Sequence, residues 1–190
     1  MKIDVYDFDG TLYRGDSTFD YIVFIVKRHI YLIFLFPIIL IYTVLLLFNG
    51  SLTVFKGRLF HLFSKFIDLK EEGKKFWSDE KINNKINKWF YECQKDIPVV
   101  IASASVDVEL MYAPPVKQCD VLICTQLDDN GYVRGKNCKS TVKIERIKQI
   151  YGNVCIRSMY TDNIKADGPL LDIAEENYIV DKKGNVNRIK

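Results

Sequence analysis

The chain has 190 residues, of which 48% are hydrophobic and 27% are charged, with 27 Lys and Arg against 24 Asp and Glu. This composition excludes an intrinsically disordered chain, and a net charge of +3 gives no reason to expect a nucleic-acid partner. Five cysteines without a Cys-x-x-Cys spacing and only two histidines exclude a recognisable zinc site, and the length suits one domain with an insertion.

The first predicted element is a short strand over residues 1–6, which ends directly before the sequence Asp-Phe-Asp-Gly-Thr-Leu. β-Branched residues favour the strand, and the Asp-Gly pair that follows favours a turn. The strand therefore delivers two acidic residues to a point where the chain reverses.

A long uncharged segment follows this strand. Residues 29–55 contain no Asp, Glu, Lys or Arg, and the centre of the run, residues 30–48, is almost wholly apolar. About 20 apolar residues in a helix cross the hydrocarbon core of a bilayer. A chain of this size has little interior in which to bury such a run, so we expect it to contact a membrane. Its late start, after a charged strand, is unlike a signal peptide.

The remainder of the chain alternates between predicted helices and strands. A lysine-rich helical pattern covers residues 57–95, and another helix covers 140–151 and ends at Gly152. Further strands are expected at 97–102, 120–127, 153–161 and 177–181. Alternation of this kind predicts an α/β fold with a Rossmann-like parallel sheet.

The strongest chemical signal lies at the end of the first strand. Asp7 and Asp9 share one face of an extended chain, and the N–H groups of Gly10 and Thr11 lie in a turn that suits an anion. Two close carboxylates need a cation or a shared proton between them, and an aspartate can attack phosphorus as a nucleophile. The pattern favours phosphoryl-transfer chemistry over two solvated surface acids.

This hexapeptide resembles the first motif of the haloacid dehalogenase superfamily of phosphohydrolases, and later residues resemble its other motifs in order. Ser103 ends an apolar strand, and Lys143 lies at the start of a helix, with Lys139 as the alternative lysine. Asp162 and Asp167 follow the next strand, separated by four residues where many relatives have three.

The resemblance also implies a division of the chain. Residues 1–12 and 97–190 would form the catalytic core of the haloacid dehalogenase fold. Residues 13–96 would form a helical, apolar cap between the first and second motifs, in the slot that determines the leaving group.

The same resemblance implies how the reaction would run. Asp7 would attack the phosphoryl group, and Asp9 would protonate the leaving oxygen and then activate water. Mg²⁺ would be held by the Asp7 carboxylate, the Asp9 carbonyl and Asp162, because hard oxygen ligands suit this ion.

The remaining motif residues would support that step. Ser103 and Lys143 would bind the phosphoryl oxygens together with the turn at Gly10 and Thr11. Asp167 would orient Lys143 or a metal-bound water, and Asn163 would share this supporting role.

Catalytic residues lie on both sides of the uncharged run, and this limits how the run can meet a membrane. Asp7 precedes it whereas Ser103 and Lys143 follow it, so both ends must lie on one side of the bilayer. A single crossing is thereby excluded, and two crossings would need about 40 residues. We expect a hairpin anchor over about 21–55, re-entrant or in-plane, with Pro37 breaking or kinking its helix. Basic residues at both ends place it at the cytoplasmic face.

An apolar insertion broken by proline directly after the first motif resembles the phosphatidylglycerophosphatase C type of membrane-associated phosphatase. That resemblance implies a lipid phosphomonoester, such as phosphatidylglycerophosphate, as substrate and the lipid bilayer as partner. Two alternatives remain open. One is a phosphatase of the phosphoserine-phosphatase type that acts on a soluble or isoprenoid phosphomonoester, and the other is a non-catalytic, membrane-anchored binding protein.

Overall fold

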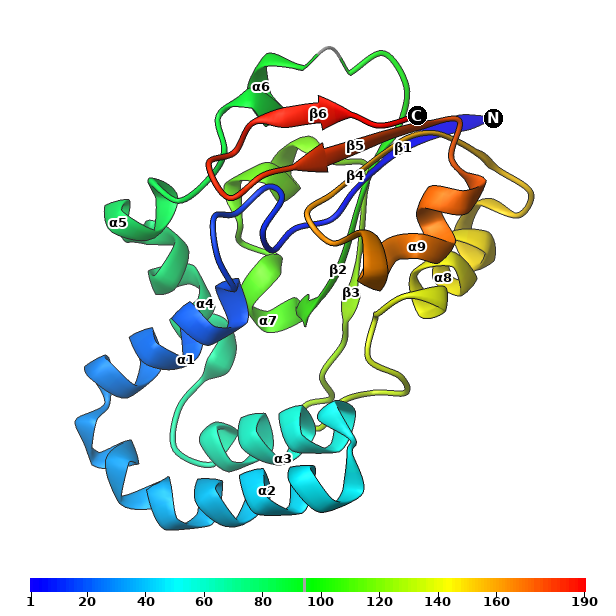
Figure 1. Cartoon of the computed structure of the whole chain (residues 1–190). Coiled ribbons are helices and arrows are strands. Elements are labelled where there is room, and N and C mark those ends of the chain that lie inside the picture. The colour runs from blue at the N-terminus through cyan, green and yellow to red at the C-terminus, as the bar shows by residue number, and fades with distance from the viewer. Residues whose placement is uncertain (94) are drawn as a thin grey trace.

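Six strands form one mostly parallel sheet in the computed structural model, which describes residues 1–93 and 95–190 (Figure 1). The strands lie in the order β3-β2-β1-β4-β5-β6, in which β6 alone is antiparallel to its described neighbour. Their bounds are β1 Lys2–Tyr6, β2 Val99–Val106, β3 Val121–Thr125, β4 Cys155–Thr161, β5 Glu176–Val180 and β6 Val186–Arg188. The predicted Rossmann-like α/β fold is confirmed, with β1 inside the sheet.

Helices fill the chain between β1 and β2 and then alternate with the later strands. Those of the insertion are α1 Ser17–Arg28, η1 Ile30–Leu35, α2 Phe36–Asn49, α3 Leu52–Ser64, α4 Leu69–Ser78, α5 Glu80–Asn83 and α6 Trp89–Glu92. The later ones are α7 Asp107–Leu110, η2 Pro114–Gln118, α8 Thr141–Tyr151 and α9 Ile164–Ile173. The helical stretch predicted over residues 57–95 extends over residue 94, which lies outside the described residues. Residues 57–93 are divided among several helices, because Asp68 and Asp79 accept backbone N–H groups and start new ones.

Both faces of the sheet are buried, as a parallel sheet requires. Ile3 and Val5 of β1 point to the face that α8 and α9 cover, where they pack against Ile147 and Leu170. Tyr6 belongs to the cluster on the other face, together with side chains of the insertion. This alternation leaves the two acidic residues that follow β1 at the carboxyl edge of the sheet.

The uncharged run is exposed and helical. The segment Ile30–Phe48 comprises 19 residues with a mean hydropathy of 2.8, is 6% buried, and is long and apolar enough to cross a membrane by length and composition. Pro37 lies in the first turn of α2, where its missing N–H is not needed, so it starts a helix instead of kinking one. Tyr21 and Ile25 are fully buried in α1, so the exposed apolar segment begins near residue 30 and not at residue 21.

Helix α3 connects the outermost helix to the part of the chain that carries the sheet. Helices α2 and α3 form a hairpin that turns at Gly50, and α2 lies on the far side of α3 from the sheet (Figure 1). The loop between β3 and α8 packs against α3, where His61 Nδ1 donates to the Asn130 carbonyl at 2.7 Å. Gly131 has a φ of +82°, and a Cβ there would lie 2.7 Å from the Phe60 carbonyl oxygen. Only glycine therefore permits this contact between loop and helix.

We expect Gly131→Ala to lower the free energy of unfolding by about 2–4 kcal/mol, because left-handed strain adds to a forced separation of loop and helix. Gly135 is the matched control: its φ is +75°, and no atom lies within 4 Å of the Cβ position. Gly135→Ala should cost only the strain of about 1–2 kcal/mol. Denaturant unfolding measures both variants, and equal losses would show that close packing at Gly131 contributes nothing.

Candidate active site

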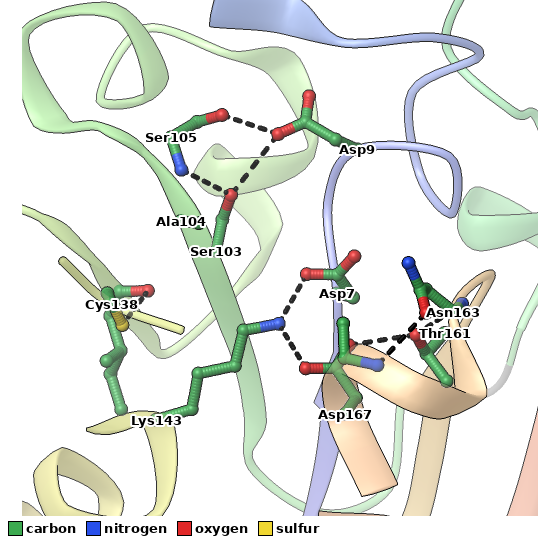
Figure 2. Close-up of polar contacts among 12 residues, drawn as sticks. Asp7, Asp9, Ser103, Ala104, Ser105, Cys138, Lys143, Thr161, Asn163 and Asp167 are labelled. Atoms are coloured by element: carbon green, nitrogen blue, oxygen red, sulfur yellow. Dashed lines mark hydrogen bonds and ion pairs between the residues drawn. The ribbon is translucent and has the colours of Figure 1, made fainter. Parts of the chain in front are cut away.

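Side chains from four separate elements meet at the carboxyl edge of the sheet (Figure 2). Lys143, in the first turn of α8, donates to Asp7 Oδ1 at 2.6 Å and to Asp167 Oδ1 at 2.8 Å. Asp7 follows β1 directly, and Asp167 lies in the first turn of α9. Lys139, the alternative lysine, is exposed, although it also lines the cleft between the insertion and the sheet. Lys143 is thus the lysine that contacts the expected nucleophile.

The contacts among these groups are buried and charged. Side chains of Lys143 and Asp167 are 4% and 2% exposed, and Thr161 Oγ1 donates to Asp167 Oδ2 at 2.8 Å. Burial lowers the pKa of Lys143, but the negative charges of Asp7 and Asp167 raise it by more. The net shift of the pKa is upward, so the ammonium is retained. Burial raises the pKa of Asp7 to about 7 against the opposing effect of Lys143. One ammonium therefore faces two carboxylates.

Removing Lys143 should leave those two carboxylates buried without a partner. We expect Lys143→Met to lower the free energy of unfolding by about 3–5 kcal/mol near neutral pH. The loss should shrink in acid, since burial raises the pKa of Asp7 to about 7 and its neutral carboxyl needs no cationic partner. Lys139→Met, four residues earlier and exposed, should change stability by no more than about 0.5 kcal/mol. Denaturant titrations of both variants at several pH values measure this, and equal stability of the two would contradict it.

Asp9 is held by donors from the cap and from β2. Ser17 N–H donates to its Oδ1 at 2.6 Å, and Ser105 Oγ donates to its Oδ2 at 2.5 Å. The Ser103 hydroxyl lies 3.5 Å from the same Oδ2, and Thr18 Oγ1 donates to Ser105 Oγ at 2.8 Å. Burial raises the pKa of Asp9 in spite of these hydrogen bonds. A raised pKa favours the protonated carboxyl that a general acid needs.

The backbone N–H groups of the turn after Asp9 form hydrogen bonds within the turn. Gly10 N–H donates to the carbonyls of Tyr13 and Gly15 at 2.8 and 3.0 Å, and Thr11 N–H donates to the Phe8 carbonyl at 3.2 Å. Gly10 lines the cleft, but Thr11 is fully buried. In this structure the turn satisfies these two donors internally, and the phosphate cradle expected at Gly10 and Thr11 stays a prediction.

The polar residues that follow β4 have different neighbours in the structure. Asp162 lies against Gly10, where a Cβ would stand 2.1 Å from Asp162 Oδ2. Asn163 caps α9, and its Oδ1 accepts the Ala166 N–H at 3.0 Å, so it supports the helix that carries Asp167. The longer spacing between the two acids is accommodated by the cap residue and the first turn of α9.

The oxygen atoms around Asp7 suit a magnesium ion. The carboxylates of Asp7 and Asp162 and the carbonyl of Asp9, which adjoins Gly10, are hard donors on two adjacent loops. Within residues 1–93 and 95–190, no three His, Cys, Asp or Glu side chains form a metal-binding group by themselves. The expected set has two carboxylates and one backbone carbonyl. Because Lys143 is shared by two carboxylates, a second cation would balance the charge.

The cap contributes a lysine and an apolar wall that the sequence did not identify. Lys56 of α3 donates to the Ala104 carbonyl at 2.9 Å, between Ser103 and Ser105. Burial lowers the pKa of Lys56, while the nearby Asp9 raises it. A cleft of about 1080 Å³ lies between cap and core, and its cap wall has an apolar part beside Arg14, Asp16 and Lys56. That wall includes Phe19, Ile22, Leu52, Phe55, Leu59 and Phe60.

No protein-family model and no curated protein matches the sequence. Among solved structures, the chain is similar to a protein with unknown function from Bordetella pertussis Tohama I, with a TM-score of 0.64 and 16% identity, covering 93% of this chain and 88% of that one. It is also similar to a phosphoserine phosphohydrolase-like protein from Francisella tularensis subsp. tularensis SCHU S4, with a TM-score of 0.50 and 17% identity, covering 93% and 86%. These likenesses show a shared fold, and they lend no support to the narrower resemblance to phosphatidylglycerophosphatase C.

Proposed function

We propose that the protein is a phosphoric monoester hydrolase that transfers a phosphoryl group first to Asp7 and then to water. The observation that carries the proposal is the junction of Asp7, Lys143 and Asp167, with Asp9 hydrogen-bonded beside it at the carboxyl edge of the sheet. The resemblance of the sequence motifs to haloacid dehalogenase phosphatases supports the same reading.

The proposed reaction has two displacements at phosphorus. An Asp7 oxygen forms a bond to phosphorus as the bond to the leaving oxygen breaks, and Asp9 gives its proton to that oxygen. Water then attacks phosphorus, Asp9 takes a proton back, and the bond to Asp7 breaks to release inorganic phosphate. Lys143 and Ser103 stabilise the charge on the other phosphoryl oxygens. Mg²⁺, when bound by Asp7, Asp162 and the Asp9 carbonyl, would reduce the repulsion between carboxylate and phosphate.

A lipid phosphate such as phosphatidylglycerophosphate is the substrate class that we favour. The cleft is large for a small phosphomonoester, and part of its cap wall is apolar. The same cap carries the exposed apolar segment Ile30–Phe48, for which a lipid bilayer is the fitting partner. Asp7 precedes this segment, Lys143 follows it, and the two are in contact, so both ends of the segment would lie on one side of the bilayer. The basic residues that flank the segment favour the cytoplasmic side.

A phosphate-release screen with Mg²⁺ in mixed micelles tests this proposal. The panel is phosphatidylglycerophosphate, phosphatidic acid, an isoprenoid phosphate and phosphoserine, and we expect turnover of a lipid substrate. Turnover of phosphoserine alone would favour the soluble alternative, to which the likeness with the Francisella tularensis protein points. Binding without release from any member would favour the non-catalytic alternative.

Membrane binding through α2 can be tested separately. We expect Leu40→Glu to weaken flotation with phosphatidylglycerol-containing vesicles, because a charge in the centre of an inserted helix costs about 2.5–3.5 kcal/mol. Ile173→Glu on α9 is the matched control, since Leu40 and Ile173 are 52% and 50% exposed but lie on different parts of the fold. Equal flotation of the two variants would show that α2 is not the anchor.

A further inference from the structure

We propose that a groove between α2 and α3 binds the apolar chain of the substrate and is continuous with the reaction cleft. This inference rests on the proposed function and specifies how the site selects an amphiphilic phosphomonoester. The hairpin groove, as we call it, has a volume of about 230 Å³. Its apolar walls include Leu45, Leu46, Val54 and Phe55, and Tyr42, Ser51 and Arg58 complete the lining.

Phe55 joins the two cavities. On α3, Leu52, Phe55, Lys56 and Leu59 follow the spacing of one helical face, and all four line the reaction cleft. Phe55 also lines the hairpin groove, so its ring lies at the boundary between the two spaces. A ligand whose phosphate reaches Asp7 can therefore extend along α3, past Phe55, and into the groove.

The chemistry of the groove fits a hydrocarbon chain. Its α2 wall belongs to the uncharged segment, and the outer side of the same helix exposes Leu47, which is 79% accessible. Positive charge occurs where the groove meets α3: the Arg58 guanidinium lies 5.7 Å from the centre of the Tyr42 ring, and Lys56 points toward the core. A ligand with an apolar chain and an anionic head would match these surfaces, with the chain against α2 and the head toward Lys56 and the core.

The groove is too small to receive a helix from another protein, and its connection to the catalytic carboxylates favours a substrate chain over an unrelated lipid. A buried methylene strengthens binding by up to about fourfold. We therefore expect the Kd of n-alkylphosphonates, which cannot be hydrolysed at the carbon–phosphorus bond, to fall about two- to fourfold for each methylene added from methyl to octyl. Calorimetry on the full chain, in one detergent and below the micellar concentration of each ligand, measures this dependence.

Two adjacent leucines of α2 provide a matched pair of variants. Leu46 lines the groove, whereas Leu47 faces outward. Leu46→Trp should fill the groove and clearly lower the ratio of methyl to octyl Kd values, while Leu47→Trp should keep the wild-type ratio. Val54→Trp, on the opposite wall, repeats the test from α3 in case Leu46→Trp does not fold.

Several outcomes would overturn the inference. Binding that does not depend on chain length in the wild-type chain would exclude a chain-binding groove. Equal effects of Leu46→Trp and Leu47→Trp would assign the dependence to general contact with the detergent or membrane surface. Phosphate release from the matching alkyl phosphates is measured in parallel. Chain-dependent binding without release would contradict the proposed function but support the groove as a chain-binding site. Release of phosphate without any dependence on chain length would support the proposed function and contradict the groove.

Discussion

Asp7→Asn is expected to reduce phosphate release to the detection limit on every phosphomonoester that the wild-type chain hydrolyses. An amide oxygen is not a competent nucleophile toward phosphorus, whereas the side chain keeps its size and can still accept a hydrogen bond from Lys143, 2.6 Å away. Initial rates of phosphate release with Mg²⁺ present measure the effect.

Asp167→Asn is the matched control for this substitution. Asp167 contacts the same ammonium at 2.8 Å but has no bond-forming role in the proposed reaction. Loss of such a supporting contact typically costs about 10- to 100-fold, so measurable turnover should remain. Wild-type rates in Asp7→Asn would refute the mechanism outright, and equal loss in both variants would assign Asp7 a supporting role only.

Asp9→Asn should slow turnover by about 10² to 10⁴-fold, because general acid–base assistance is typically worth that much. Its carbonyl remains available to a metal, and an amide oxygen can still accept the Ser17 N–H. The loss should be largest for alkyl phosphates, whose leaving oxygens need a proton, and smaller for an activated aryl phosphate. Comparison of kcat/KM on the two substrate types measures the difference.

A uniform loss on alkyl and aryl phosphates would contradict the role of Asp9 as general acid. It would indicate instead that the carboxyl holds Ser17 and Ser105 in place. Ser105→Ala offers a useful comparison, since it removes a hydrogen-bond donor to Asp9 without removing the acid.

The fold could be predicted from the sequence because its signals are local. Apolar runs with β-branched residues mark the parallel strands, and Gly152 ends α8 as expected. The helix boundaries within the insertion were harder to predict from the sequence, because they depend on capping by Asp68 and Asp79 and on how helices pack. Pro37 shows the same limit: a proline that breaks a helix and a proline that begins one have the same sequence signature.

The site was predicted in part for a comparable reason. Asp7, Lys143 and Asp167 are brought together by strand ends and helix starts, whose order along the chain is visible in the sequence. Thr161 donates to Asp167, and Ser105 donates to Asp9, through side-chain geometry that no spacing reveals. Lys56 enters the cleft from the cap, and only the packing of α3 on the core determines that position.

The turn at Gly10 shows what a motif does not reveal about backbone hydrogen bonds. The N–H groups of Gly10 and Thr11 were expected to bind an anion, and in this structure they donate to carbonyls of the same turn. Glycine is required there because Asp162 fills the space that a side chain would occupy.

The central claim is that phosphate passes through a covalent bond to Asp7, and one measurement tests it most directly. Asp9→Asn is mixed with an activated aryl phosphate and Mg²⁺, quenched in acid, and digested for mass spectrometry. This leaving group needs no proton from Asp9, whereas the attacking water must give a proton to Asp9, so a phosphorylated enzyme should accumulate in Asp9→Asn. The expected result is one phosphoryl group on the peptide that contains Asp7, absent when Asp7 is also replaced by Asn. Turnover of the aryl phosphate without any phosphorylated peptide, or with phosphate on another residue, would contradict the account.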